Sequence, residues 1–152
     1  MNIVVLMKQV PDLVEGLEID PSGKALDVAS LRYILSESDD HALEQALLIK
    51  EKVGGRVEVF ALNQGEARES LLTAIAKGAD RAVLVDAGLD SPPDNHAAAQ
   101  IFTTLLRAGQ FDLVLTGVRA IDDLDGSLGG LVAGSFDLPY AALIRKAEAD
   151  GD

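Results

Sequence analysis

Residues Phe111 to Ala133 read FDLVLTGVRAIDDLDGSLGGLVA: an apolar run, a loop rich in acid and glycine, and a second apolar run. The first run, Phe111 to Thr116, has the length and composition of a buried strand. The second begins a predicted helix, Ser127 to Phe136, that is rich in small residues at its start. A strand that passes through a glycine-rich loop into a helix is typical of the parallel sheets of α/β proteins.

The rest of the chain repeats this alternation. Further strands are predicted at 2–10, 56–62, 81–85 and 140–146, helices at 39–53, 66–77 and 94–108, and a small turn-centred excursion at 17–26. Ser38 or Asp39 is expected to cap the first helix and Asp94 the third. The pattern predicts one domain over residues 1–152, an α/β, Rossmann-like doubly wound parallel sheet with strand order 3-2-1-4-5.

The amino-acid composition excludes several classes of function for this chain. The chain has 13 basic and 25 acidic residues, a formal net charge of −12, and no cysteine. Nucleic-acid or anionic-membrane binding needs clustered lysine and arginine, which this sequence does not contain. The lack of cysteine excludes disulfides, thiolate metal sites and a cysteine nucleophile. The N-terminal apolar run is too short for a signal peptide, so we expect a cytoplasmic chain without membrane insertion.

A ligand crevice is expected where the strand order reverses, between the ends of the first and fourth strands. The first strand ends within Lys8-Gln9-Val10-Pro11-Asp12, and the fourth runs into the loop that starts at Gly117. Gly117 and Gly126 allow a sharp turn or a close approach to a ligand, and the helix start at Ser127 suits a phosphate. A structural alternative stays open, in which Asp125 or Ser127 caps the helix while Gly129 and Gly130 only pack on the sheet.

The aspartates of the loop oppose a bare phosphate. Asp122, Asp123 and Asp125 would repel it unless basic groups or a metal offset them, and Lys8 and Arg119 are the nearby candidates. The spacing lacks the distal glutamate of a calcium loop, so we expect no metal site. One carboxylate is expected to bind ribose hydroxyls while the others are solvated. No pair of residues can be given acid and base roles, so we expect no catalytic residue.

Four motifs occur together in one order: VVLMKQVPD, DDHALEQALLIKE, TAIAKGADRAVLV and DLVLTGVRAIDDLDGSLGGLVAGSFDLP. With them the whole chain resembles the N-terminal domain of the electron transfer flavoprotein β subunit, a family that includes the FixA-type proteins. The resemblance implies a fold like that of the adenine nucleotide α-hydrolases. It also implies an electron-carrier subunit rather than an enzyme.

In that family the β subunit pairs with an α subunit that holds a redox-active FAD, and it binds AMP or a second FAD itself. Electrons pass from dehydrogenases, such as acyl-CoA dehydrogenase, to a respiratory acceptor. The resemblance thus implies AMP or another adenine nucleotide in the crevice, FAD on the partner, and these cofactor-binding residues: Leu6, Lys8, Ser36, Asp39, Gly117, Arg119, Ala120, Asp123, Gly126, Ser127, Leu128 and Gly129.

The chain departs from the family pattern at three places. Ser36-Glu37 replace the usual Asn-Pro, Asn63-Gln64-Gly65 replace a Gly-Pro, and Gly126-Ser127-Leu128 replace a segment with glutamine. Nucleotide contacts are therefore expected to change, with the Ser127 hydroxyl replacing part of the lost glutamine contact.

The family subunit also continues for roughly a hundred residues more, so we expect a truncated subunit or a short homologue. We then expect the isolated chain to self-associate, either through an uncovered edge at 140–146 or through the face that in the family meets the α subunit. An alternative is a stand-alone adenine-nucleotide-binding or interaction domain similar to universal stress proteins, without a redox role. An enzyme of the nucleotide α-hydrolase type is disfavoured, because no S-G-G-x-D-S loop follows the first strand.

Overall fold

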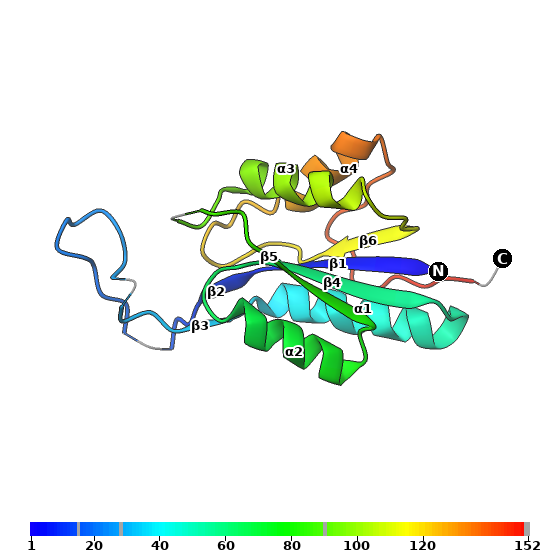
Figure 1. The fold of residues 1–152 in the computed structure, drawn as a ribbon, viewed down its shortest axis with the longest axis horizontal. Coiled ribbons are helices and arrows are strands. Elements are labelled where there is room, and N and C mark those ends of the chain that lie inside the picture. Colours follow the sequence, from blue (N-terminus) through cyan, green and yellow to red (C-terminus); the bar gives the residue numbers. More distant parts are fainter. Residues whose placement is uncertain (15, 28, 90, 151–152) are drawn as a thin grey trace.

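The computed structural model covers residues 1–152 and describes all of them except 15, 28, 90 and 151–152. A parallel four-stranded sheet has the order β5-β4-β1-β6, with β1 Asn2–Met7, β4 Arg56–Leu62, β5 Arg81–Val85 and β6 Leu113–Thr116. Helices α1 (Glu37–Val53) and α2 (Ala67–Lys77) cover one face, and α3 (Asn95–Leu106) and α4 (Leu128–Phe136) cover the other (Figure 1). The predicted doubly wound fold is confirmed.

The sheet is built around β1, the most buried strand. Ile3, Val5 and Met7 pack against the α1 and α2 layer, whereas Val4 and Leu6 pack against α3 and α4. Successive residues of a strand point to opposite faces, so a continuous apolar run is what a strand covered on both sides requires. The two cores therefore meet the sheet from opposite sides, and the C-terminal ends of the strands form one edge.

The predicted order 3-2-1-4-5 counts the predicted strands along the chain. Its first four members are correct and correspond to β5-β4-β1-β6, whereas the fifth is wrong. All of residues 140–146 are described, and none lies in a strand. Asp137 ends α4 in the left-handed conformation, and Leu143 has φ +55°, which an extended strand does not tolerate. Farther on, the Gln45 Nε2 donates to the Ala147 carbonyl oxygen at 2.9 Å, which ties the tail to α1.

The predicted strand at 2–10 is in fact two elements. β1 ends at Met7, and β2 (Gln9–Pro11) pairs antiparallel with β3 (Tyr33–Leu35), a short strand that the sequence analysis did not predict. Between them the backbone N–H of Lys8 donates to Asp39 instead of to a neighbouring strand. The excursion that follows is confirmed as two arms, joined by a bridge between Ile19 and Leu26.

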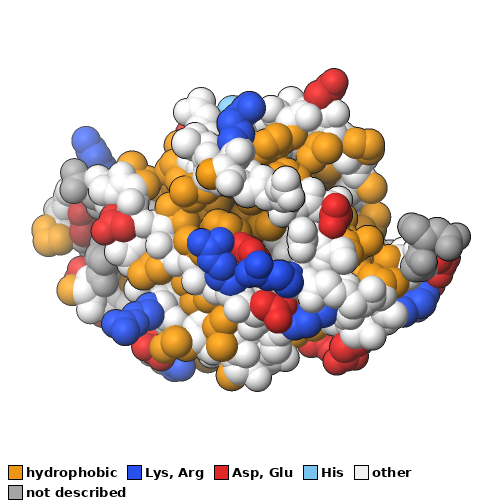
Figure 2. Space-filling model, turned by 45° about the vertical axis from the view of Figure 1, so that its right-hand side comes forward, with side chains coloured by type: hydrophobic (Ala, Val, Ile, Leu, Met, Phe, Trp, Pro, Cys, Tyr) orange, Lys and Arg blue, Asp and Glu red, His pale blue; other side chains and the backbone are white. Residues whose placement is uncertain are grey.

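One face of the molecule leaves apolar side chains uncovered. Figure 2 shows them gathered in a hollowed area at the centre of the view, beside a group of basic and acidic side chains. Exposed hydrophobic residues of the edge strand β5 and of α2 are Leu84, Leu72 and Ile75. Within the described part of the chain, no helix is both long enough and apolar enough to cross a membrane.

Candidate functional site

The carboxylate of Asp39 joins three elements at the point where the strand order reverses. Its Oδ2 accepts the backbone N–H of Lys8 at 2.9 Å, and its Oδ1 accepts the backbone N–H of Gly117 at 2.7 Å. Asp39 lies in the first turn of α1 and is buried. Burial raises the pKa of this carboxyl to about 7, although the two backbone N–H groups favour its charged form.

Two serines extend this junction to the loop after β6. The hydroxyls of Ser36 and Ser38 lie 3.2 Å apart, and Ser38 Oγ donates to the carbonyl oxygen of Arg119 at 3.1 Å. A Cβ atom on Gly117 would lie 2.3 Å from Asp39 Oδ1 and 2.4 Å from Ser38 Oγ. Gly117 is therefore required for the close packing of α1 on the end of β6.

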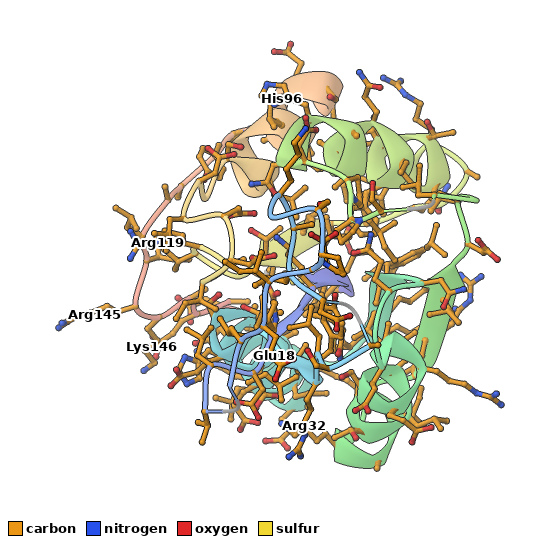
Figure 3. All side chains as sticks on the ribbon, turned by 90° about the vertical axis from the view of Figure 1, so that its left-hand side faces the viewer. Glu18, Arg32, His96, Arg119, Arg145 and Lys146 are labelled. Atoms are coloured by element: carbon orange, nitrogen blue, oxygen red, sulfur yellow. The ribbon has the colours of Figure 1, made fainter. Side chains whose placement is uncertain are left out.

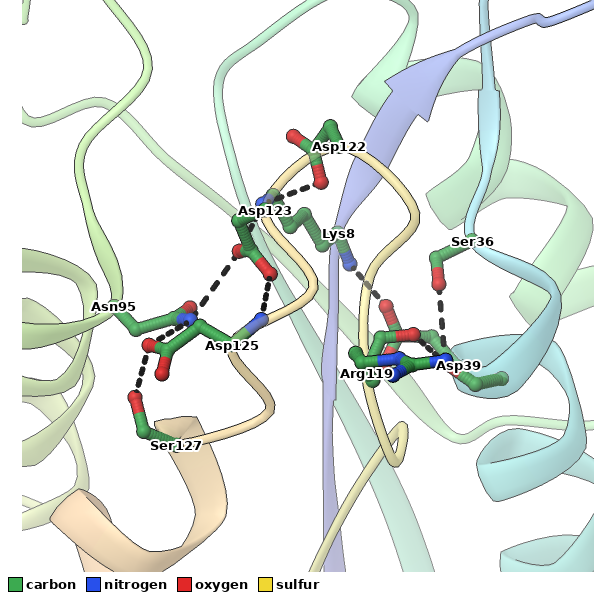
Figure 4. A network of polar contacts seen from close by, with 10 residues as sticks. Lys8, Ser36, Asp39, Asn95, Arg119, Asp122, Asp123, Asp125 and Ser127 are labelled. Carbon is green, nitrogen blue, oxygen red and sulfur yellow. Dashed lines mark hydrogen bonds and ion pairs between the residues drawn. The ribbon is translucent and has the colours of Figure 1, made fainter.

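Lys8 neutralises part of the acidic loop, as Figure 4 shows. Its Nζ lies 2.9 Å from Asp122 Oδ1 and 2.8 Å from Asp123 Oδ2. Partial burial acts to lower the pKa of Lys8, but the hydrogen bonds and charges of the two aspartates outweigh it and raise that pKa. Asp122 and Asp123 are both exposed to solvent, and their pairing with Lys8 was not predicted from the sequence.

Asn95, at the start of α3, holds the second half of the loop. Its Nδ2 donates to Asp123 Oδ2 at 3.2 Å and to Asp125 Oδ2 at 2.8 Å (Figure 4). Ser127 Oγ donates to the same oxygen of Asp125. Burial alone would raise the pKa of Asp123, but its bonds to Lys8, to the Asp125 N–H and to Asn95 lower it. The loop is thus fastened to both β1 and α3.

The glycines around the start of α4 have different structural roles. Gly126 has φ +63°, and a Cβ there would lie 2.7 Å from the carbonyl oxygen of Val118. Gly129 and Gly130 pack against the ring of Tyr140, 3.1 and 3.4 Å from their would-be Cβ atoms. Ser127 occupies the N-cap position but makes no side-chain cap bond. The N–H groups of the first helical turn have no partner within the helix and remain available to an acceptor.

The structure brings most of the predicted cofactor-binding residues to one edge of the sheet. The end of β1 supplies Lys8, the start of α1 supplies Ser36 and Asp39, and the loop after β6 with the start of α4 supplies Gly117, Arg119, Ala120, Asp123, Gly126, Ser127, Leu128 and Gly129. Leu6 is the exception, because its side chain is 1% exposed and packs in the core below α3 and α4.

Arg119 is the exposed cation of the loop. Its guanidinium makes no ion pair or hydrogen bond with any other residue that the structure describes, and Figure 3 places it at one margin of the molecule with Arg145 and Lys146. Lys8 is already engaged by two carboxylates, so Arg119 is the loop cation that is available to an anion.

A small pocket that opens to solvent adjoins the loop. Leu62, Ala98 and Phe102 give it apolar walls, and Gln9, Gln64 and Asn95 add polar groups. None of these three polar residues was predicted from the sequence to bind a cofactor. Gln9 lies within the KQVPD motif, directly after Lys8, and its position was the signal that could have identified it.

Comparisons with known proteins show which family the chain is similar to. Residues 25–152 match the family model described as Electron transfer flavoprotein domain. Over 152 residues the chain is 38% identical to the electron transfer flavoprotein subunit beta of Thermoanaerobacterium thermosaccharolyticum, covering 100% of this chain and 58% of that protein. It is 33% identical to Protein FixA of Sinorhizobium fredii, covering 96% of this chain and 53% of that protein.

A third relative is an electron transfer subunit of an acryloyl-CoA reductase. The acryloyl-CoA reductase electron transfer subunit gamma of Anaerotignum propionicum is 32% identical over 153 residues, covering 97% of this chain and 57% of that protein. The chain thus spans less than two thirds of the length of these relatives.

Proposed function

The chain belongs to the electron transfer flavoprotein β-subunit family, and from this premise we propose that it binds AMP or a related adenine nucleotide as part of an electron-transferring complex. The nucleotide lies across the C-terminal ends of β1 and β6. One observation carries the proposal: the loop from Gly117 to Gly129 is held in place at the switch point by side chains from β1, α1 and α3. Ligands of doubly wound sheets bind at such a point.

Phosphate is assigned to the start of α4. Helix N-termini bind anions through free N–H groups and the helix dipole, and Gly126 lets the backbone turn there without a side chain. The aspartates of the loop would oppose a phosphate. Asp122 and Asp123 are offset by Lys8, and Asp125 accepts hydrogen bonds from Asn95 and Ser127. Arg119 supplies the remaining positive charge at the mouth of the crevice.

The nucleotide assigned to this chain does not carry the electrons. AMP has no redox-active ring, so electron transfer requires a flavin, which we assign to a partner subunit of the α type. The residues that meet the crevice bind and orient the nucleotide: hydroxyls of Ser36, Ser38 and Ser127, and backbone N–H groups of α4. In this proposal dehydrogenases donate electrons to the complex, and the chain contributes no catalytic residue.

Isothermal titration calorimetry with AMP, ADP and FAD tests the proposal. We expect AMP to bind the chain, and we expect Gly126→Val to abolish that binding because a side chain at φ +63° collides with the Val118 carbonyl oxygen. Gly23→Val is the matched control, since Gly23 has φ +70° but nothing within 4 Å of its would-be Cβ. The absence of heat with all three ligands at millimolar concentration would reject nucleotide binding.

A further inference from the structure

Gln9 has a buried side-chain amide whose oxygen has no hydrogen-bond partner among the residues that the structure describes. Its side chain is 6% exposed, and its Nε2 donates to Ser70 Oγ on α2. Its Oε1 is buried and accepts no hydrogen bond from the residues that the structure describes. A buried acceptor without a donor is unfavourable, and nearly all such groups in folded proteins have a partner.

The same residue lines the pocket beside the loop. The apolar walls of that pocket, among them Leu62, Ala98 and Phe102, suit the faces of a flat ring. Asn95 connects the two halves of the site, because it lines the pocket and also donates to Asp123 and Asp125 of the loop. A nucleotide with its phosphate at α4 would therefore have its base within reach of this pocket.

We propose that Gln9 determines base specificity: its Oε1 accepts a hydrogen bond from the 6-amino group of adenine, which presupposes the nucleotide binding proposed above. Hypoxanthine has a carbonyl oxygen at the same ring position. Two acceptors would then face each other, and the buried Oε1 would stay without a donor. A site that is built around one hydrogen bond rejects the analogue that lacks it. The pocket thus prefers AMP to IMP.

The ligands alone provide the first test. Titration calorimetry on the unmodified chain should show AMP binding at least about tenfold more tightly than IMP, the effect of roughly one hydrogen bond. N6,N6-dimethyl-AMP, which has no N–H at this position, should bind as weakly as IMP. Equal affinity for AMP and IMP would overturn the role of Gln9 while leaving nucleotide binding intact. Binding of neither nucleotide would reject the proposed function itself.

A matched pair of variants provides the second test. Gln9→Met removes the acceptor at similar volume and should bring the affinities for AMP and IMP to within about twofold, mainly by weakening AMP. Gln100→Met makes the same change at an exposed glutamine of α3 that does not line the pocket, and it should keep the preference. Thermal unfolding checks that both variants fold. Loss of the preference in Gln100→Met, or its persistence in a folded Gln9→Met, would contradict the assignment.

Discussion

At the switch point, single residues are constrained by close packing that the sequence only suggested. Glycine at 117 was predicted to permit close approach, but the partner was expected to be a ligand. The structure shows Asp39 and Ser38 in that space. A sequence read along the chain cannot show that residues 78 positions apart share a hydrogen bond, so this pairing was not predictable.

Gly117→Ala tests this packing. The new Cβ would lie 2.3 Å from Asp39 Oδ1, so α1 or the loop must move and the hydrogen bond from the Gly117 N–H would be strained. We expect a loss of about 2 kcal/mol or more in the free energy of unfolding. Gly134→Ala is the control, because its would-be Cβ meets nothing within 4 Å and alanine favours a helix by roughly 1 kcal/mol. Similar urea midpoints for the two variants would refute the argument.

The buried carboxyl of Asp39 predicts a pH dependence of stability. Its pKa in the folded state, about 7, lies above the ordinary value of 3.8 for an aspartate carboxyl. The folded state therefore binds the proton more tightly, and this contribution is fully present below pH 4 and lost as the pH rises through 7. We expect the melting temperature to fall by about 5 °C from pH 5 to pH 8.

Asp39→Asn is the control for that slope. An amide does not titrate, so the variant should show a markedly smaller change of melting temperature over the same interval. A melting temperature of the unmodified chain that rises or stays constant from pH 5 to pH 8 would show that Asp39 is already ionised at pH 5.

At the scale of elements, the hydrophobic pattern predicted the strands of the sheet. Contacts between residues far apart in the sequence determine where the first helix begins and which segments pair as strands. The strands at 56–62 and 81–85 were predicted with the bounds that the structure shows. The first helix begins at Glu37 with Ser36 at the N-cap, not at Ser38 or Asp39, because the Asp39 carboxylate binds two strand ends instead of its own helix. The run at 140–146 has strand composition but makes no strand pairing.

Two helix starts offer a comparison of capping. Asp94 accepts the backbone N–H of Ala97 at 2.8 Å, as predicted, whereas Ser127 makes no cap bond. We expect Asp94→Ala to cost about 1 kcal/mol and to lower the melting temperature by roughly 3 °C. Ser127→Ala should change it by less than about 1 °C. Equal losses would mean that Ser127 caps α4 in solution.

At the scale of the whole molecule, the family pattern predicted the fold correctly, whereas the contacts that hold the acidic loop could be found only in the three-dimensional structure. The net charge of −12 gave no hint that Lys8 and Asn95 fasten the aspartates between β1 and α3. Self-association was predicted from an edge strand that the structure does not contain. Residues 140–146 therefore give no reason to expect self-association through an exposed strand edge.

The central claim is that an adenine nucleotide binds across the ends of β1 and β6. Amide chemical shifts of the ¹⁵N-labelled chain, recorded during titration with AMP, test it most directly because they report where the ligand lies. We expect the largest changes at Lys8, at Gly117 and from Gly126 to Gly129, with α2 and the exposed edge of β5 unaffected. No shift changes up to millimolar AMP, or changes concentrated on α2 and β5, would contradict the account.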